Sequence, residues 1–259
     1  MHSQSIDSLT LVPAPAIDSV SLRLKSVQKM EARWYNEAYN NSLYDTLIPV
    51  VSNDSYDAIY YPELPTDTLK KRLAILDAKT PFNIAYNPAL ESVIKRYLKS
   101  RKRSTETLIN RSQYYFPMFE EVLDKHNLPL EIKYLAVVES ALKPRAKSRV
   151  GATGLWQFMF ATGKQYGLEV SSYVDERCDP LRSTNAAAKY LASLYKTFGD
   201  WDLALAAYNS GPGNVTKAIR RSGGYQNYWN IRPFLPSETA GYLPAFLATF
   251  YLFEYADAH

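Results

Sequence analysis

The stretch DPLRSTNAAAKYLASLYKTFGDWDLALAAYN, residues 179–209, decides the fold. Asp179 followed by Pro180 is the typical start of a helix, because the aspartate caps the first turn and the proline fits its first position. Gly199 predicts the end of that helix after Phe198, and Asp200 predicts the cap of the next. The stretch therefore indicates two consecutive helices with a very short connection.

The same start and stop signals recur on both sides of this stretch. Pro129 is expected to open a helix as its first residue, which Pro144 closes after Leu142. Further on, Asn214 and Ser237 are expected to cap helices, the second of them kinked or restarted at Pro244. Two more apolar helical patterns cover residues 88–98 and 105–126. Alternating strand patterns of useful length are absent from the sequence, so the expected class is all-α.

The first third of the chain has a weaker pattern. Residues 1–20 are expected to form an extended tail, and residues 21–44 an amphipathic helix. Residues 45–88 contain five prolines and many Asn, Asp and Thr residues, which predict loops and short helical turns that wrap the main domain.

Composition excludes several kinds of site. The 259 residues carry 30 Lys and Arg against 26 Asp and Glu, a net charge of +4 that does not argue for nucleic-acid binding. The three histidines and the single cysteine, Cys178, leave almost nothing for a Ser-His-Asp triad or a cysteine-ligated metal. No metal or other cofactor is expected. Acid–base chemistry would have to use carboxylates and tyrosines.

Glu139 is the first candidate for such chemistry. It lies in the last turn of the expected helix 129–142, with Leu135, Ala136 and Leu142 as neighbours at helical spacing. Burial and the negative end of the helix dipole both disfavour the ionised carboxyl, and a carboxyl protonated near neutral pH is what a general acid requires. On this helix alone the alternative remains open that Glu139 points outward or pairs with Lys143 or Arg145.

Several motifs follow in fixed order: ES at 139–140, Ser148, GATGLWQFM at 151–159, AYNSGPG at 207–213 and ETAGY at 238–242. This set resembles the lytic transglycosylases of glycoside hydrolase family 23, in particular the D-type murein enzymes. The resemblance covers about residues 86–258. It implies an all-α, lysozyme-like domain over residues 86–259, preceded by an N-terminal tail and helical wrapping segment over residues 1–85.

The resemblance also implies roles by position. Glu139 matches the catalytic acid and base of the family. The saccharide cleft is expected to be lined by Ser148, Gln157, Met159, Tyr208, Asn209, Glu238 and Tyr242. Either Tyr208 or Tyr242 is expected to hydrogen-bond the carboxyl or the sugar. Plain packing for Met159 and helix-end hydrogen bonding for Asn209 remain alternatives.

The implied reaction cleaves the bond between N-acetylmuramic acid and N-acetylglucosamine without water and leaves a 1,6-anhydro ring. The resemblance further implies a monomer in the periplasm or cell envelope that acts on peptidoglycan strands, with a lipoprotein signal for the outer membrane removed from this chain. A goose-type lysozyme that uses water, and a glycan-binding scaffold without catalysis, are the alternatives. Phe160 stands where the family usually has proline, and Cys178 is expected to be a thiol without a catalytic role.

Overall fold

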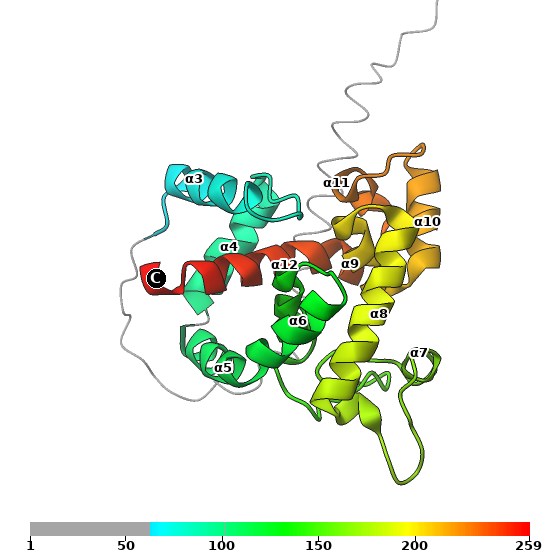
Figure 1. Cartoon of the computed structure of the whole chain (residues 1–259). Coiled ribbons are helices and arrows are strands. Elements are labelled where there is room, and N and C mark those ends of the chain that lie inside the picture. Colours follow the sequence, from blue (N-terminus) through cyan, green and yellow to red (C-terminus); the bar gives the residue numbers. More distant parts are fainter. Residues whose placement is uncertain (1–62, 101) are drawn as a thin grey trace, which may run out of the picture. The chain divides into compact units, whose positions relative to one another are not determined.

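The computed structural model describes residues 63–259 except residue 101, and the side chains of residues 100–104 are not described. These residues all belong to one compact unit (Figure 1). Its α-helices are α3 Thr66–Asp77, α4 Pro88–Ser100, α5 Lys102–Lys125, α6 Lys133–Ser140, α7 Phe160–Gln165, α8 Pro180–Phe198, α9 Trp201–Ser210, α10 Pro212–Arg221, α11 Tyr228–Ile231 and α12 Ser237–Glu254. Short 3₁₀ turns are η1 Leu130–Ile132, η2 Glu176–Cys178, η3 Arg232–Phe234 and η4 Ala256–Ala258. The described part holds only isolated β-bridges and no strand, so the all-α expectation is confirmed.

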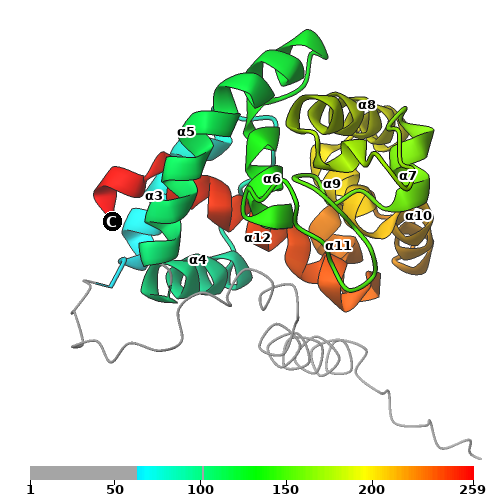
Figure 2. The ribbon, with the colours of Figure 1, turned by 90° about the horizontal axis from the view of Figure 1, so that it is seen from below.

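Helix α12 forms the centre of this unit. It is apolar on every side and nearly all of it from Thr239 to Leu252 is buried, as expected for a helix surrounded by others. It contacts α4 and α6 as well as α9, and both views show it between α3–α5 and α8–α11 (Figures 1 and 2). None of the helices in the described part has the length and apolar content that a membrane span requires.

Pro244 lies inside α12 without dividing it into two helices. A proline has no N–H, so the carbonyl of Ala240, four residues earlier, loses its helical donor. The Tyr228 hydroxyl and the Arg232 Nε donate to that carbonyl instead, each at 2.9 Å. Of the two expectations for Pro244, a kink or a restart of the helix, the restart is therefore wrong. The two donors fix α11 and η3 against α12.

The two helices of the opening stretch form as predicted. The Asp179 side chain accepts from the Arg182 N–H, and the Asp200 side chain accepts from the Leu203 N–H. Gly199 ends α8 in the left-handed conformation, with φ of 66°. Capping residues thus locate helix boundaries well where a short polar side chain stands before the first turn.

Other boundaries differ from the sequence-based ones. In place of the expected helix 129–142, the chain forms η1 followed by α6. Pro129 precedes η1 and is not a first helical residue, and α6 ends at Ser140. Asn214 caps nothing: α10 begins at Pro212, and the Asn214 amide donates to the Ser210 carbonyl at 2.9 Å. Ser237 is the first residue of α12 and makes no capping bond.

Residues 63–85 contain more helix than expected. Helix α3 has 12 residues and buries Leu69, Leu73 and Leu76, which lie three and four residues apart and form one apolar stripe. Arg72 Nη1 donates to the Tyr251 hydroxyl of α12 at 2.9 Å. The expected tail and helix at 1–20 and 21–44 lie outside the described residues. The domain boundary at residue 85 stays a prediction.

Candidate active site

Glu139 stands one residue before the end of α6. The helix ends there because Ala141 and Leu142 both adopt left-handed backbone conformations, with φ of 50° and 57°. Such conformations are unfavourable for residues other than glycine and are characteristic of functional sites. Arg111 Nη1 donates to the Ala141 carbonyl at 3.0 Å and so holds this helix end.

The environment of Glu139 keeps its carboxyl protonated near neutral pH. The residue is half-buried, and Leu135, Ala136 and Leu142 around it are almost fully buried. Burial raises the pKa of Glu139 to about 8, the hydrogen bond from Tyr242 opposes the rise, and the charge of Glu238 adds to it. No ion pair joins Glu139 to any cation in the described part, which removes the alternative of pairing with lysine or arginine.

Tyr242 is the direct partner of Glu139. It lies on α12, is only 1% exposed, and donates its hydroxyl hydrogen to Glu139 Oε1. Burial and the nearby Glu139 carboxyl raise the pKa of Tyr242 well above its usual value, so the hydroxyl stays a donor. Of the two tyrosines expected to reach the carboxyl, Tyr242 makes the bond.

Glu238 lies one helical turn before Tyr242 and is exposed. Its Oε1 accepts from the Asn209 amide at 3.3 Å, and the Asn209 oxygen accepts from the Thr239 hydroxyl at 2.7 Å. Asn209 therefore joins the end of α9 to the start of α12 and does not bond its own helix end. These contacts bring Glu139, Tyr242, Glu238 and Asn209 together at one site.

Tyr208 serves the neighbouring loop. Its hydroxyl donates to the Trp156 carbonyl at 2.8 Å, and its ring packs against Tyr190 at 5.2 Å between centroids. Burial, with the Glu139 charge as the second cause, raises its pKa well above the ordinary value. The Tyr208 hydroxyl thus holds the backbone of Trp156, the residue before Gln157.

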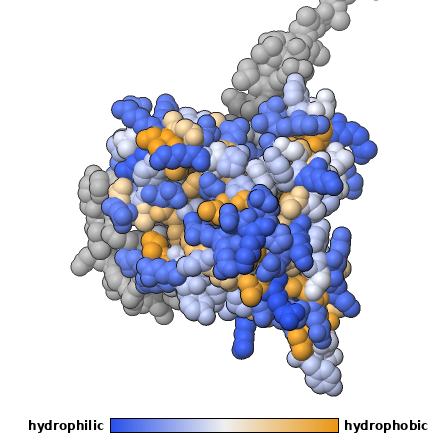
Figure 3. Space-filling model, viewed as in Figure 1, coloured by the Kyte–Doolittle hydropathy of each residue, from blue (hydrophilic) through white to orange (hydrophobic). Residues whose placement is uncertain are grey.

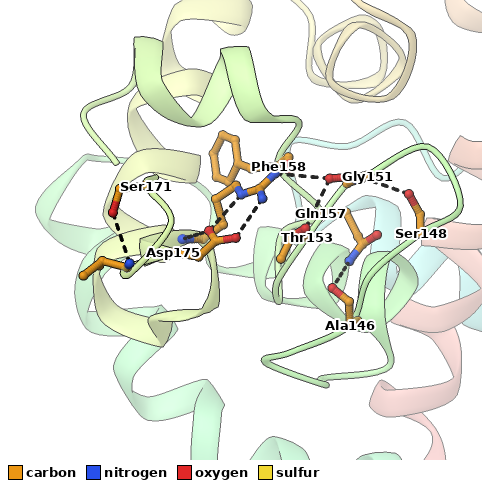
Figure 4. Close-up of polar contacts among 11 residues, drawn as sticks. Ala146, Ser148, Gly151, Thr153, Gln157, Phe158, Ser171 and Asp175 are labelled. Carbon is orange, nitrogen blue, oxygen red and sulfur yellow. Dashed lines mark hydrogen bonds and ion pairs between the residues drawn. The ribbon is translucent and has the colours of Figure 1, made fainter. Parts of the chain in front are cut away.

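Gln157 turns its amide into its own loop. Its backbone is left-handed, with φ of 48°, and Nε2 donates to the carbonyls of Gly154 at 2.9 Å and Ala146 at 3.2 Å. Figure 4 shows the side chain directed at Ala146. The amide oxygen accepts no hydrogen bond among the described residues and remains available to a ligand.

Ser148 and Met159 stand at the two ends of this loop. Ser148 Oγ accepts from the Ala152 N–H at 3.0 Å, so the hydroxyl stabilises the turn between them. Met159 is 45% exposed, so the structure does not support the plain-packing alternative for it.

Arg177, which the sequence analysis did not single out, holds the loop together. The residue is buried, and its guanidinium donates to the carbonyls of Gly151 and Phe158 at 3.1 and 3.2 Å. Asp175 anchors it through Nε at 2.9 Å and Nη2 at 2.7 Å. Gly154 packs so closely here that an added Cβ would lie 1.8 Å from the Arg177 carbonyl oxygen. The sequence Asp175-Glu176-Arg177, just before Cys178, was the available signal for the ion pair between Asp175 and Arg177.

The arrangement provides one proton donor and several amides. A carboxyl with a pKa of about 8 can give a proton to a leaving oxygen at neutral pH and take one back. The residues described include no group of three or more His, Cys, Asp or Glu side chains suited to a metal ion. Cys178 is a half-buried free thiol whose pKa burial raises, which disfavours the reactive thiolate.

Comparison with known proteins gives a family for this part of the chain. Residues 117–231 match the family described as the transglycosylase SLT domain. The chain is 35% identical over 179 residues to membrane-bound lytic murein transglycosylase D of Escherichia coli K12, covering 68% of this chain and 39% of that protein. It is 36% identical over 120 residues to the soluble lytic murein transglycosylase of the same strain, covering 44% of this chain and 19% of that protein.

The chain thus spans about two fifths of the length of the first of these relatives. Among solved structures, the 70 kDa soluble lytic transglycosylase of Escherichia coli aligns with 95% of this chain and 38% of its own, at 23% identity and a TM-score of 0.49. The family match agrees with the transglycosylase family that the motifs implied.

Proposed function

We propose that this chain, whose residues 117–231 form a transglycosylase SLT domain, is a lytic transglycosylase that cleaves peptidoglycan without water. The observation that carries the proposal is the half-buried Glu139 carboxyl, with a pKa of about 8 and the Tyr242 hydroxyl bonded to it. The names of both Escherichia coli relatives describe murein transglycosylases, which supports the same substrate.

In the proposed first step, protonated Glu139 donates to the oxygen that joins N-acetylmuramic acid to N-acetylglucosamine. The bond from carbon-1 to that oxygen breaks, and the substrate's own 2-acetamido group stabilises the positive charge that develops at carbon-1. Tyr242 holds the resulting carboxylate through its hydrogen bond.

In the proposed second step, the Glu139 carboxylate takes the proton of the muramoyl 6-hydroxyl. That oxygen attacks carbon-1 and closes the 1,6-anhydro ring, which returns the proton to Glu139. An internal hydroxyl competes well with water because its effective concentration is very high. One carboxyl, that of Glu139, thus acts in both steps. Glu238, which is exposed and hydrogen-bonded to Asn209, lines the saccharide cleft in this proposal.

We assign substrate binding to the remaining site residues. The Gln157 amide oxygen is open to an acetamido or hydroxyl donor, and Asn209 presents its amide beside Glu238. Ser148 and Tyr208 act through the loop that carries Gln157, since their hydroxyls bond its backbone. Met159 offers an exposed apolar contact for a sugar face.

Further parts of the proposal concern the domains, the family and the location. Residues 86–259 form the catalytic domain, and α3 of the preceding segment braces α12 through Arg72 and Tyr251. We assign the domain to glycoside hydrolase family 23 and place its action in the cell envelope, as the relatives' names suggest. A periplasmic monomer and an outer-membrane lipoprotein anchor remain predictions.

Mass spectrometry of muropeptides released from purified sacculi tests the reaction. The proposal predicts products that end in 1,6-anhydro-N-acetylmuramic acid and resist reduction by borohydride. Products with a reducible end would instead assign the water-using reaction of a goose-type lysozyme. Binding to sacculi without any product would favour the non-catalytic scaffold.

A further inference from the structure

Four cations stand at alternate positions in the segment that follows Glu139: Lys143, Arg145, Lys147 and Arg149, here called the basic row. All four are exposed, while Pro144, Ala146 and Ser148 between them are half-buried. The chain in this segment therefore directs its charges outward and its small side chains inward. A row of this kind on a surface attracts anionic groups.

The basic row keeps its charge available. None of its members forms an ion pair with the acidic side chains of the described residues. Asp175, whose pKa is lowered by Arg177 first and by Lys147 last, is already held by Arg177 at 2.7 Å. Hydrophilic side chains gather over the middle of the face in Figure 3, where Figure 1 places α6 and the segment that follows it.

The basic row is also fixed next to the candidate active site. Arg145 and Lys147 flank Ala146, whose carbonyl accepts from Gln157 Nε2 at 3.2 Å and from the Gly154 N–H at 2.9 Å. Lys147 itself forms a β-bridge with Thr153. The backbone between these cations is therefore anchored to the loop that carries Gln157, and a glycan bound at Gln157 passes close to the charges.

We propose that the basic row binds the free carboxylates of the peptide stems of peptidoglycan. This rests on the proposed function. In intact peptidoglycan the lactyl carboxyl of muramic acid is bound in an amide to its stem, so the free carboxylates lie on the stems and not on the sugars. A strand that places its glycan along Glu139 and Gln157 brings its stems within reach of a fixed line of cations, which favours strands that carry stems over bare glycan.

The test measures binding without digestion, in a Glu139→Gln background. Lys143, Arg145, Lys147 and Arg149 are all replaced by Gln, and the protein is pelleted at low salt with intact sacculi. A second set of sacculi has its carboxyls converted to neutral amides by carbodiimide and ethanolamine, which keeps the stems. Two control variants accompany this one. In the first, each Lys of the basic row becomes Arg and each Arg becomes Lys. In the second, the basic row is intact and four exposed cations of α8 and α10 are replaced by Gln: Lys189, Lys196, Lys217 and Arg220.

We expect the neutral row to weaken binding to intact sacculi about tenfold, since one exposed ion pair contributes a factor of roughly 1.5 to 5. Binding to the amidated sacculi should be equally weak for both proteins. The row with Lys and Arg exchanged keeps its charge and should bind normally, and the α8 and α10 variant should lose less than twofold. Added salt should abolish the difference.

Three results would overturn the proposal: an unchanged affinity of the neutral row, an equal loss on intact and amidated sacculi, or an equal loss in the α8 and α10 variant. Loss of binding to anionic phospholipid vesicles, with sacculus binding intact, would assign the row to a membrane surface instead. Release of 1,6-anhydro products by the unaltered protein is measured separately, so the proposed reaction and the proposed role of the basic row can be refuted independently.

Discussion

Replacing Glu139 with Gln should stabilise the fold, and the gain should grow with pH. Folding raises the pKa of Glu139 from 4.5 to about 8, so the folded protein holds this proton more tightly than the unfolded chain does. Wild-type stability therefore falls as pH rises from about 4.5 to about 8 and is constant above that, as far as this group is concerned. An amide at the same position has no proton to lose.

The size of the effect follows from the pKa difference. A shift from 4.5 to about 8 corresponds to about 5 kcal/mol, at about 1.4 kcal/mol per pKa unit. Glu139 is half-buried, so solvent screening makes this an upper bound, and about 2 to 4 kcal/mol is the expected gain. The Tyr242 hydroxyl can donate to the amide oxygen of Gln as it does to the carboxyl, so the substitution keeps this hydrogen bond.

The assay is urea unfolding of both proteins at about pH 4.5, 6, 7, 8 and 9, with the difference in unfolding free energy plotted against pH. The point near pH 4.5 serves as the control, because at that pH Glu139 is protonated in the folded protein and no charge is buried. Other carboxylates contribute equally to both proteins and cancel in the difference. A difference that stays flat between about pH 5 and 8, or a wild type more stable at pH 9, would refute the reasoning.

The remaining predictions concern the partners of Glu139 and its loop. Tyr242→Phe removes the bond that lowers the Glu139 pKa, so the alkaline limb of kcat/KM should move up by about 1 to 2 pH units; a downward shift would contradict this. Glu238→Gln removes a charge that raises the same pKa, so the limb should move down, and an upward shift would count against the assignment. Gly154→Ala should cost more than about 3 kcal/mol of unfolding free energy, because its Cβ would lie 1.8 Å from a backbone oxygen, at a φ of +91°. Gly151→Ala, at a φ of +89° with no atom within 4 Å, should cost only about 1 to 2 kcal/mol in the same urea titration; equal costs would show that the close contact is not decisive.

Local signals in the sequence predicted most of the helices and the position of Glu139 at a helix end. Asp179 and Asp200 set the starts of α8 and α9 because short carboxylates satisfy the free N–H groups of a first turn. The four-residue spacing of Glu238 and Tyr242 placed both on one side of α12. Glu139 was expected at a helix end among apolar neighbours, and the structure places it there.

The contacts that shape the loop could not be predicted in this way. Ala141 and Gln157 take left-handed conformations that no local pattern demands of these residue types, and the surrounding structure imposes them. The Tyr208 hydroxyl bonds the Trp156 carbonyl, 52 residues earlier in the chain. The Arg177 guanidinium likewise reaches Gly151, 26 residues away. Such partners follow from tertiary packing, which periodicity and capping rules do not contain.

The most direct test of the account is the rate at which 1,6-anhydro ends appear when wild-type, Glu139→Gln and Glu238→Gln proteins digest the same sacculi. General acid–base catalysis contributes about 100- to 10,000-fold, and Glu139 serves both steps, so its replacement should lower the rate by about 10,000-fold or more. Glu238→Gln should retain far more activity, since in our proposal Glu238 lines the cleft and transfers no proton, and melting curves should show both variants folded. A Glu139→Gln protein that forms anhydro ends at nearly the wild-type rate would contradict the assignment of Glu139 as the single acid and base.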